Sequence, residues 1–199
     1  MNPTIFLGLG AFGKEISQQH FKTIKVDEER HFSFFSIDKH ISFGSRVGAI
    51  DTYDDVVFDF SDDKTHQENL SIFLKSKSIV KNYLYTAFSS LGELDYDTSD
   101  SNEISVLVYF GLSEPCSSSI ILEVLELIKS HPSYHNIRFY LFGFNYDLFV
   151  QPQHAKFKDY KKRSYACLTE LDDKINSGFN NVASFSIFSS KLSDSIHTV

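Results

Sequence analysis

Short apolar runs alternate along the chain with segments that show helical spacing of apolar residues. Such runs are typical of strands buried on both faces, as in a parallel sheet. They cover residues 5–7, 31–38, 56–60, 104–110, 137–144 and 182–188. The amphipathic segments predict helices over about residues 14–24, 69–81, 120–129 and 161–175, and residues 92–102 form an acidic segment that we interpret as a solvated loop.

This alternation of strands and helices predicts the fold class. Strands separated by helices of 10 to 15 residues are typical of βαβ units, whose helices cover both faces of the sheet. We therefore predict an α/β fold with three layers and a mostly parallel sheet. The length of 199 residues favours a single domain over residues 1–199.

A glycine-rich turn follows the first predicted strand and opens the first helix. Its residues are Gly8, Gly10, Ala11, Phe12 and Gly13. Glycines allow a tight turn with close backbone approach, and the N–H groups that begin a helix can bind a phosphate. The turn predicts a nucleotide or anion site. The alternative is that these glycines only let the strand and the helix pack closely.

Two further segments are predicted to lie at the same edge of the sheet. Asp38 ends the second strand, where a dinucleotide fold contacts a ribose hydroxyl. Ser113 and Ser117 follow the strand at 104–110, and their hydroxyls are candidates for anion binding. Serine is also an ordinary helix N-cap, and Glu114 between them would repel a phosphate. No pattern ties Cys116 to a base, so we predict no catalytic residue and no metal site.

Charge and composition exclude several kinds of partner. The net charge is −7 and no long stretch concentrates Lys and Arg, so we expect no nucleic-acid partner. No apolar run reaches the roughly 18 residues of a membrane helix, and the start of the sequence does not read as a signal peptide. The two cysteines form no paired motif. These features predict a cytoplasmic protein without a membrane partner.

Five segments resemble the nucleotide-binding half of bacterial tubulin-like proteins, the tubulin/FtsZ superfamily. Residues 163–172 are the most distinctive, because Arg-Ser-Tyr-Ala-Cys-Leu-Thr-Glu-Leu-Asp is similar to the family's Asn-Ala-Tyr-Ala-x-Leu-x-Glu-Leu at the start of its central helix. The others are residues 4–13, 34–38, 104–129 and 137–149. The resemblance implies the family's nucleotide-binding fold, with GTP or GDP as the expected ligand.

Departures from the family pattern concern the residues that would hold the nucleotide. The family's Gly-Gly-Thr-Gly-Ser-Gly loop corresponds to Leu-Ser-Glu-Pro-Cys-Ser at residues 112–117, which has no glycine. Ser164 or a neighbour stands where the family has an asparagine that contacts guanine. The second domain, which supplies the acidic group for hydrolysis in this family, has no counterpart in the sequence. The resemblance thus implies the fold much more strongly than it implies GTP hydrolysis.

Three functions remain open, and we favour the first. It is a degenerate tubulin-like domain that acts as a protein-assembly or regulatory module, through self-assembly or a protein partner, with weak or lost guanine-nucleotide binding. The second is an active GTP-binding, polymerising protein that is a GTPase only if a partner chain supplies the missing half. The third is the NAD-binding domain of an oxidoreductase. Against the third, 25 residues separate Gly13 from Asp38, where the fingerprint expects about 20.

Overall fold

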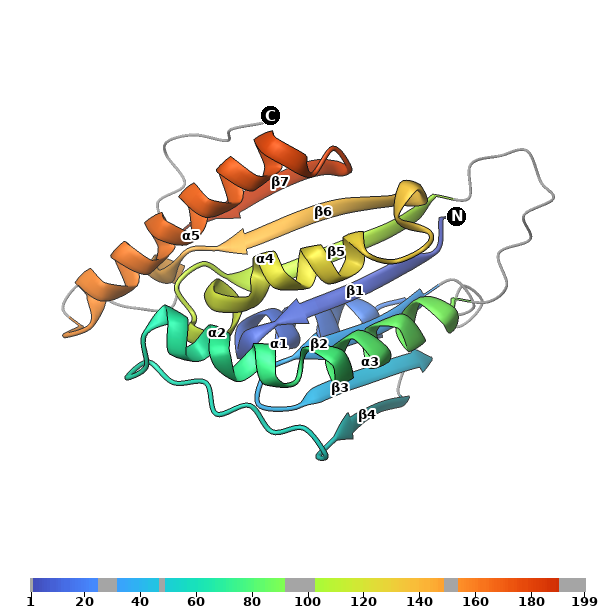
Figure 1. Ribbon diagram of the computed structural model, residues 1–199, viewed down its shortest axis with the longest axis horizontal. Coiled ribbons are helices and arrows are strands. Elements are labelled where there is room, and N and C mark those ends of the chain that lie inside the picture. Colours follow the sequence, from blue (N-terminus) through green and yellow to red (C-terminus); the bar gives the residue numbers. More distant parts are fainter. Residues whose placement is uncertain (1, 25–31, 47–48, 92–102, 149–153, 190–199) are drawn as a thin grey trace.

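A seven-stranded sheet with the strand order β4-β3-β2-β1-β5-β6-β7 forms the centre of the molecule (Figure 1). The computed structural model describes residues 2–24, 32–46, 49–91, 103–148 and 154–189. The strands are β1 (Thr4–Leu9), β2 (Phe32–Ile37), β3 (Ile41–Arg46), β4 (Ala49–Tyr53), β5 (Ile104–Gly111), β6 (Ile137–Phe144) and β7 (Val182–Phe188).

Five strands of the sheet pair in parallel with one another. The remaining two, β3 and β4, make antiparallel pairs. β1 pairs in parallel with both β2 and β5, and the parallel pairing continues through β6 to β7. β3 pairs antiparallel with β2, and β4 antiparallel with β3. The predicted α/β fold with a mostly parallel sheet is therefore confirmed.

Helices cover both faces of this sheet, as predicted. α1 (Gly10–Lys22) packs on one face, behind β1 in the view of Figure 1. The other helices lie on the opposite face: α2 (His66–Lys75), α3 (Lys77–Ser89), α4 (Pro115–Lys129) and α5 (Phe157–Gly178). Two short 3-10 helices, η2 (Tyr134–Asn136) and η3 (Tyr146–Leu148), flank β6.

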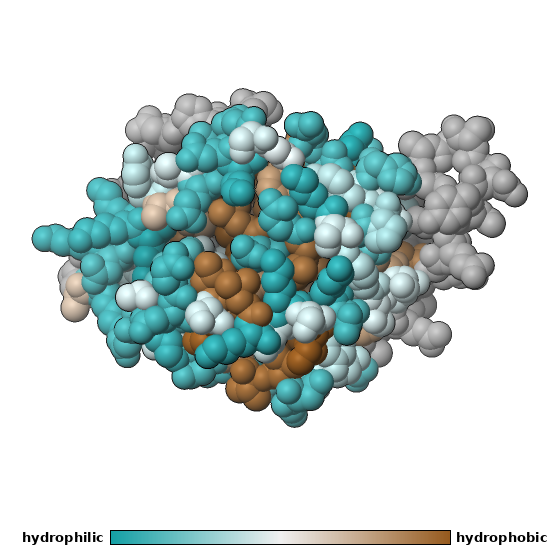
Figure 2. All heavy atoms as spheres, in the orientation of Figure 1, coloured by the Kyte–Doolittle hydropathy of each residue, from teal (hydrophilic) through white to brown (hydrophobic). Residues whose placement is uncertain are grey.

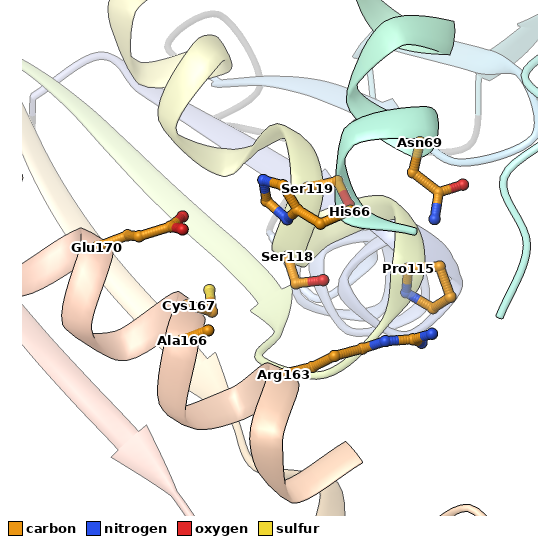
Figure 3. Close-up of a pocket in the computed structure, with 9 residues that line it drawn as sticks. All are labelled: His66, Asn69, Pro115, Ser118, Ser119, Arg163, Ala166, Cys167 and Glu170. Carbon is orange, nitrogen blue, oxygen red and sulfur yellow. The ribbon is translucent and has the colours of Figure 1, made fainter. Parts of the chain in front are cut away.

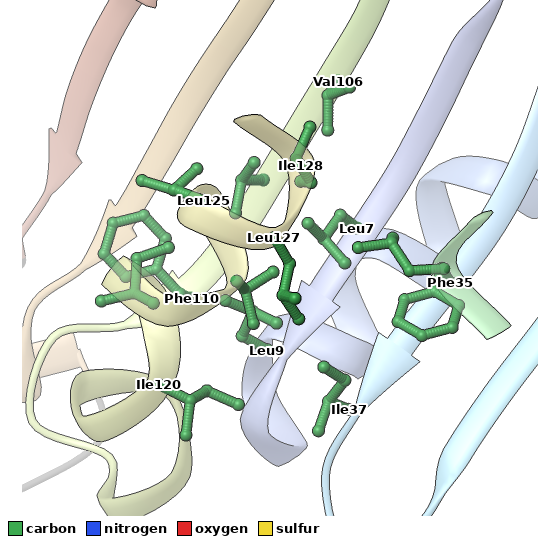
Figure 4. Close-up of a cluster of buried hydrophobic side chains, with 14 of the residues drawn as sticks. Leu7, Leu9, Phe35, Ile37, Val106, Phe110, Ile120, Leu125, Leu127 and Ile128 are labelled. Carbon is green, nitrogen blue, oxygen red and sulfur yellow. The ribbon is translucent and has the colours of Figure 1, made fainter. Parts of the chain in front are cut away.

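Each face of the sheet has its own apolar core. The alternation of side chains along β1 places Leu7 and Leu9 under α4, whereas Phe6 lies under α1. The core beneath the four helices is aliphatic for the most part and fully buried (Figure 4). The core beneath α1 is aromatic and consists of Phe6, Phe21, Phe32, Phe34, Tyr109 and Phe144. Phenylalanines thus dominate the layer between α1 and the sheet, and further phenylalanines belong to the core on the opposite face.

Two of the predicted elements are wrong. Residues 56–60 do not form a strand: the backbone of this segment makes one hydrogen bond to the sheet edge, from the Phe58 N–H to the Lys39 carbonyl. The single helix predicted over 69–81 is two helices, α2 and α3, which meet at Ser76. The hairpin of β3 and β4 was not predicted. Residue 31 of the second predicted strand and the acidic segment 92–102 lie outside the described residues.

Candidate functional site

The predicted glycine turn and the serine-containing turn meet at one edge of the sheet. β1 and β5 are neighbours, and both turns leave their carboxyl ends. The chain continues from β1 to β2 on one side and from β5 to β6 on the other. A crevice between helices that depart in opposite directions is the usual ligand position in open α/β sheets. The candidate site is therefore the space between the start of α1 and the start of α4.

Gly8 and Gly13 have a packing role in this turn. A Cβ atom at Gly8 would overlap the Ser17 hydroxyl and the backbone of α1. A Cβ atom at Gly13 would overlap the carbonyl oxygen of Tyr109 in β5. Both glycines let α1 lie directly against the sheet, which is the packing role that the motif also allows.

Gly10 has a different role, because it faces the crevice. Its φ angle is 76°, in the left-handed region that favours glycine. A Cβ atom at Gly10 would overlap the carboxylate of Glu114. The space that this glycine leaves open is thus filled by an acidic side chain from the neighbouring turn.

Glu114 binds the first N–H groups of α1. Its Oε1 atom accepts hydrogen bonds from the backbone N–H of Ala11 at 2.6 Å and from that of Phe12 at 3.4 Å. The start of α1 has no local cap, because Leu9 at the N-cap position makes no side-chain hydrogen bond and the first turn has no acidic residue. Glu114 supplies the missing anion from a distant part of the sequence. The N–H groups that would bind a phosphate are already bound to a carboxylate.

The ionisation of Glu114 is finely balanced. Burial raises the pKa of this carboxyl to about 7, and the nearby charge of Asp38 adds to the rise. Hydrogen bonds from Ala11, Phe12 and Ser117 lower the pKa and offset part of the effect of burial. The carboxyl is consequently partly protonated near neutral pH.

Serine hydroxyls at the start of α4 bind backbone carbonyls of their own turn. The Ser117 hydroxyl donates to the Gly111 carbonyl at 2.6 Å, and the Ser118 hydroxyl donates to the Glu114 carbonyl at 2.7 Å. Ser113 is buried in the same turn. Pro115 occupies the first turn of α4, where it removes one N–H donor. The start of α4 therefore has one N–H donor fewer than a helix start without proline.

Cys116 also turns toward the α1 side of the crevice. Its thiol donates to the Ile37 carbonyl at 3.6 Å, and a hydrogen bond from the Gly10 N–H reaches its sulfur. Burial raises the pKa of the thiol well above its ordinary value, and the charges of Glu114 and Asp38 raise it further. A protonated, buried thiol is a poor nucleophile.

The structure brings most of the predicted site residues together. The glycine turn, Ser113, Ser117 and Asp38 surround the Glu114 carboxylate or lie in the adjoining turns. Ser164 stands apart: it is buried in α5, which packs against α4 and η3, and its hydroxyl has no hydrogen-bond partner among the described residues. The sequence singled out Glu114 only as a source of repulsion, and its contact with α1 was missed.

A separate pocket of about 200 Å³ lies between α2, α4 and α5 (Figure 3). Its polar groups are largely engaged in the fold. Arg163 is bound to Asp62 at 2.6 Å, and burial raises the pKa of the Cys167 thiol to about 12. The other polar residues of the lining are His66, Asn69, Ser118, Ser119 and Glu170. Among the residues that the structure describes, no three His, Cys, Asp or Glu side chains are grouped as a metal site requires.

The helix-covered face carries both apolar and hydrophilic residues. Apolar residues gather in the middle of this face, where α4 lies, and hydrophilic residues surround them (Figure 2). None of the helices within the described ranges is both long enough and apolar enough to cross a membrane. Comparison with protein-family models, with curated proteins and with solved structures finds no match to this chain.

Proposed function

We propose that this chain is a degenerate nucleotide-binding domain of the tubulin-like type, which acts as a protein-assembly or regulatory module. The observation that supports the proposal is the position of Glu114. Its carboxylate accepts the Ala11 and Phe12 N–H bonds and fills the space beside Gly10. A nucleotide phosphate at this helix start would have to displace a carboxylate that is covalently part of the domain.

The two alternative functions both require that space. A GTP-binding, polymerising protein would place its phosphates at the starts of α1 and α4, where Glu114 and Pro115 now lie. An NAD-binding domain would place its pyrophosphate at the start of α1 and a ribose at Asp38. Asp38 already acts on Glu114 as a like charge, which makes a second anion in the crevice still less favourable.

Thermal unfolding with GTP, GDP, ATP and NAD tests the loss of nucleotide binding. A ligand at 100 times its Kd stabilises the folded state by about 2.7 kcal/mol. For a domain of this size that corresponds to a rise of roughly 5–10 °C in Tm. We expect no rise in Tm with any of the four at millimolar concentration. A rise with GTP or GDP alone would establish the GTP-binding alternative, and a rise with NAD that Asp38→Ala removes would establish the third function.

The assembly part of the proposal is supported by the exposed end of β7. Ile187 and Phe188 are 48% and 44% exposed, although both are large apolar residues in a strand of the sheet. Phe188 stacks on Phe144 with ring centroids 5.1 Å apart, and Phe144 in turn packs on Phe12 of the glycine turn. Aromatic side chains left accessible at a strand end are typical of contact surfaces.

Sedimentation velocity over a range of protein concentrations tests self-assembly. We expect a concentration-dependent increase in the sedimentation coefficient that Phe188→Ser reduces. Tyr165→Ser is a matched control, because Tyr165 is 74% exposed but lies on α5. If the chain stays monomeric at all concentrations, self-assembly is excluded and only association with a different protein remains. If Phe188→Ser and Tyr165→Ser have equal effects, the end of β7 is not the contact surface.

A further inference from the structure

β7 forms one end of the sheet, and among the described residues no strand lies on its outer side (Figure 1). None of its residues is buried, whereas every residue of β1 in the centre is. Ile187 is 48% exposed, so the end of the strand is not covered. An edge strand of this kind presents backbone N–H and C=O groups that can pair with a further strand.

The hydrogen bonds to β6 show which backbone groups of β7 face outward. The Asn145 N–H donates to the Phe188 carbonyl at 2.8 Å. Because backbone groups alternate in direction along a strand, those of Ser186 also point to β6, and those of Phe185 and Ile187 point away from it. The outward N–H and C=O groups of these two residues make no hydrogen bond to any residue that the structure describes.

The opposite edge of the sheet carries features that hinder pairing, and most of them are missing from β7. β4 has only five residues, includes the exposed Asp51, and pairs with β3 through an irregular register. Short length, charge and bulges are the usual protection of an edge strand. β7 is longer, its sequence Val-Ala-Ser-Phe-Ser-Ile-Phe has no charged residue and no proline, and its register shift precedes Ser184. β7 is thus the edge at which another strand can join the sheet.

The outward groups of β7 are complementary to themselves about Ser186. In an antiparallel pair centred on this residue, Phe185 lies opposite Ile187 of the second copy and exchanges both backbone hydrogen bonds with it. Each aromatic ring then faces a β-branched side chain, a favourable cross-strand pair. Ser184 stands opposite Phe188 of the second copy, where its small side chain leaves room for the ring. This two-fold symmetry favours a second copy of the chain over an unrelated strand.

We propose that β7 pairs antiparallel with β7 of a second copy, centred on Ser186, and joins the two sheets into one. This inference rests on the proposed assembly function, and it names the partner and the mode of contact. The net charge of −7 on each chain makes two copies repel, and an uncharged strand is where they approach at the least cost. The assembly stops at a dimer, because the edge left at either end is the protected β4.

Oxidative cross-linking of the full chain tests the pairing. The two copies of Ser186 form a non-hydrogen-bonded pair on the symmetry axis, with Cα atoms about 4.5 Å apart. A disulfide spans that distance, so Ser186→Cys should give a covalent dimer on oxidation. Ser184→Cys is the matched control on the same face of β7, because its two copies would lie about 14 Å apart, beyond the reach of a disulfide. The native Cys116 and Cys167 are buried and are present in both variants.

Ile187→Pro tests the outward backbone groups themselves. Proline removes an N–H that points away from β6, so the ladder between β6 and β7 is kept. We expect the Kd of the dimer, measured by sedimentation equilibrium, to rise by about tenfold or more. Ile187→Thr is the matched control, because threonine is also β-branched and retains the N–H group.

Equal cross-linking of Ser186→Cys and Ser184→Cys, or none in either variant, would overturn the pairing. An equal Kd for Ile187→Pro and Ile187→Thr would overturn it as well. If the wild type still assembles as its concentration rises, the proposed assembly function then stands without this contact. A rise in Tm with a nucleotide is a separate result: it would contradict the loss of nucleotide binding and leave the β7 pairing in place.

Discussion

The Glu114 carboxylate accepts a hydrogen bond from the Ala11 N–H at 2.6 Å, although 103 residues separate the two in the sequence. This contact joins the β1–α1 unit to the β5–α4 unit at the point where their strands pair. It also completes the capping of α1, whose own N-cap residue, Leu9, offers no acceptor side chain. The capping of the start of α1 therefore depends on the start of α4.

Glu114→Gln should change how stability depends on pH. Because the folded pKa of about 7 lies above the ordinary 4.5, Glu114 favours the folded state fully below pH 4.5. That contribution is lost as the pH rises to 7, and it amounts to about 3 kcal/mol at most. Urea unfolding at pH 5 and pH 8 measures it as the difference between the wild type and Glu114→Gln.

The comparison with the variant also removes the effect of other groups. Burial lowers the pKa of His20 and of His131, so these two residues weaken the folded state as the pH falls below 6.5. Both histidines are present in either protein and cancel in the difference. Identical pH profiles for the wild type and Glu114→Gln would show that the buried carboxyl has an ordinary pKa.

Gly10→Ala should destabilise the protein by about 2 kcal/mol, because alanine at φ 76° is strained. The new methyl group would also collide with the Glu114 carboxylate. Gly178→Ala is the matched control, because a Cβ atom there meets only the end of Lys129, at 3.6 Å. We expect less than about 0.5 kcal/mol from the control in urea unfolding. A Gly10→Ala cost as small as that of the control would contradict the described geometry of the turn.

The sheet and its central strands were predictable because their apolar runs are long and unbroken. The segment 56–60 shows where this logic fails. Val56 and Phe58 are buried, with Val57 between them 65% exposed, so the side chains alternate as they do in a strand. The Phe58 and Phe60 rings stack 5.3 Å apart beneath the helices. Alternation reports which side chains are buried, and it does not show whether the backbone pairs with a neighbour.

The site was predictable in its parts but not in its central contact. The glycine spacing located the turn, and strand order placed the second turn beside it. An acidic side chain at the edge of a crevice can repel an anionic ligand, or it can occupy the ligand's position itself. Which of the two happens depends on how far the side chain extends and on the direction of the backbone. The position of Gly10 at φ 76°, with the Glu114 carboxylate in the space beside it, is a property of the folded chain. No local pattern links that space to a glutamate from the other turn.

The start of α2 is marked in the sequence by a recognisable capping motif. Thr65 and Glu68 form a reciprocal capping box, in which the Glu68 carboxylate accepts from the Thr65 N–H at 2.7 Å. Thr65→Ala should cost about 1 kcal/mol in urea unfolding. Thr86→Ala is the control, because the Thr86 hydroxyl only donates to the Asn82 carbonyl inside α3. Equal costs for the two variants would mean that the capping box contributes nothing beyond an ordinary threonine.

Arg163 fixes the first turns of α5 to the loop before α2. Its guanidinium donates to the Asp62 carboxylate at 2.6 Å and to the Asp62 backbone carbonyl at 2.7 Å. Lysine cannot make both bonds from one planar group, so Arg163→Lys should cost about 1 kcal/mol. Arg138→Lys is the matched control, since Arg138 is 40% exposed and pairs with Glu103 at 3.2 Å through its Nε atom. Urea unfolding should show a near-neutral control, because half-exposed pairs contribute little. A neutral Arg163→Lys would mean that α5 is held by its apolar face alone, through Cys167 and Leu171.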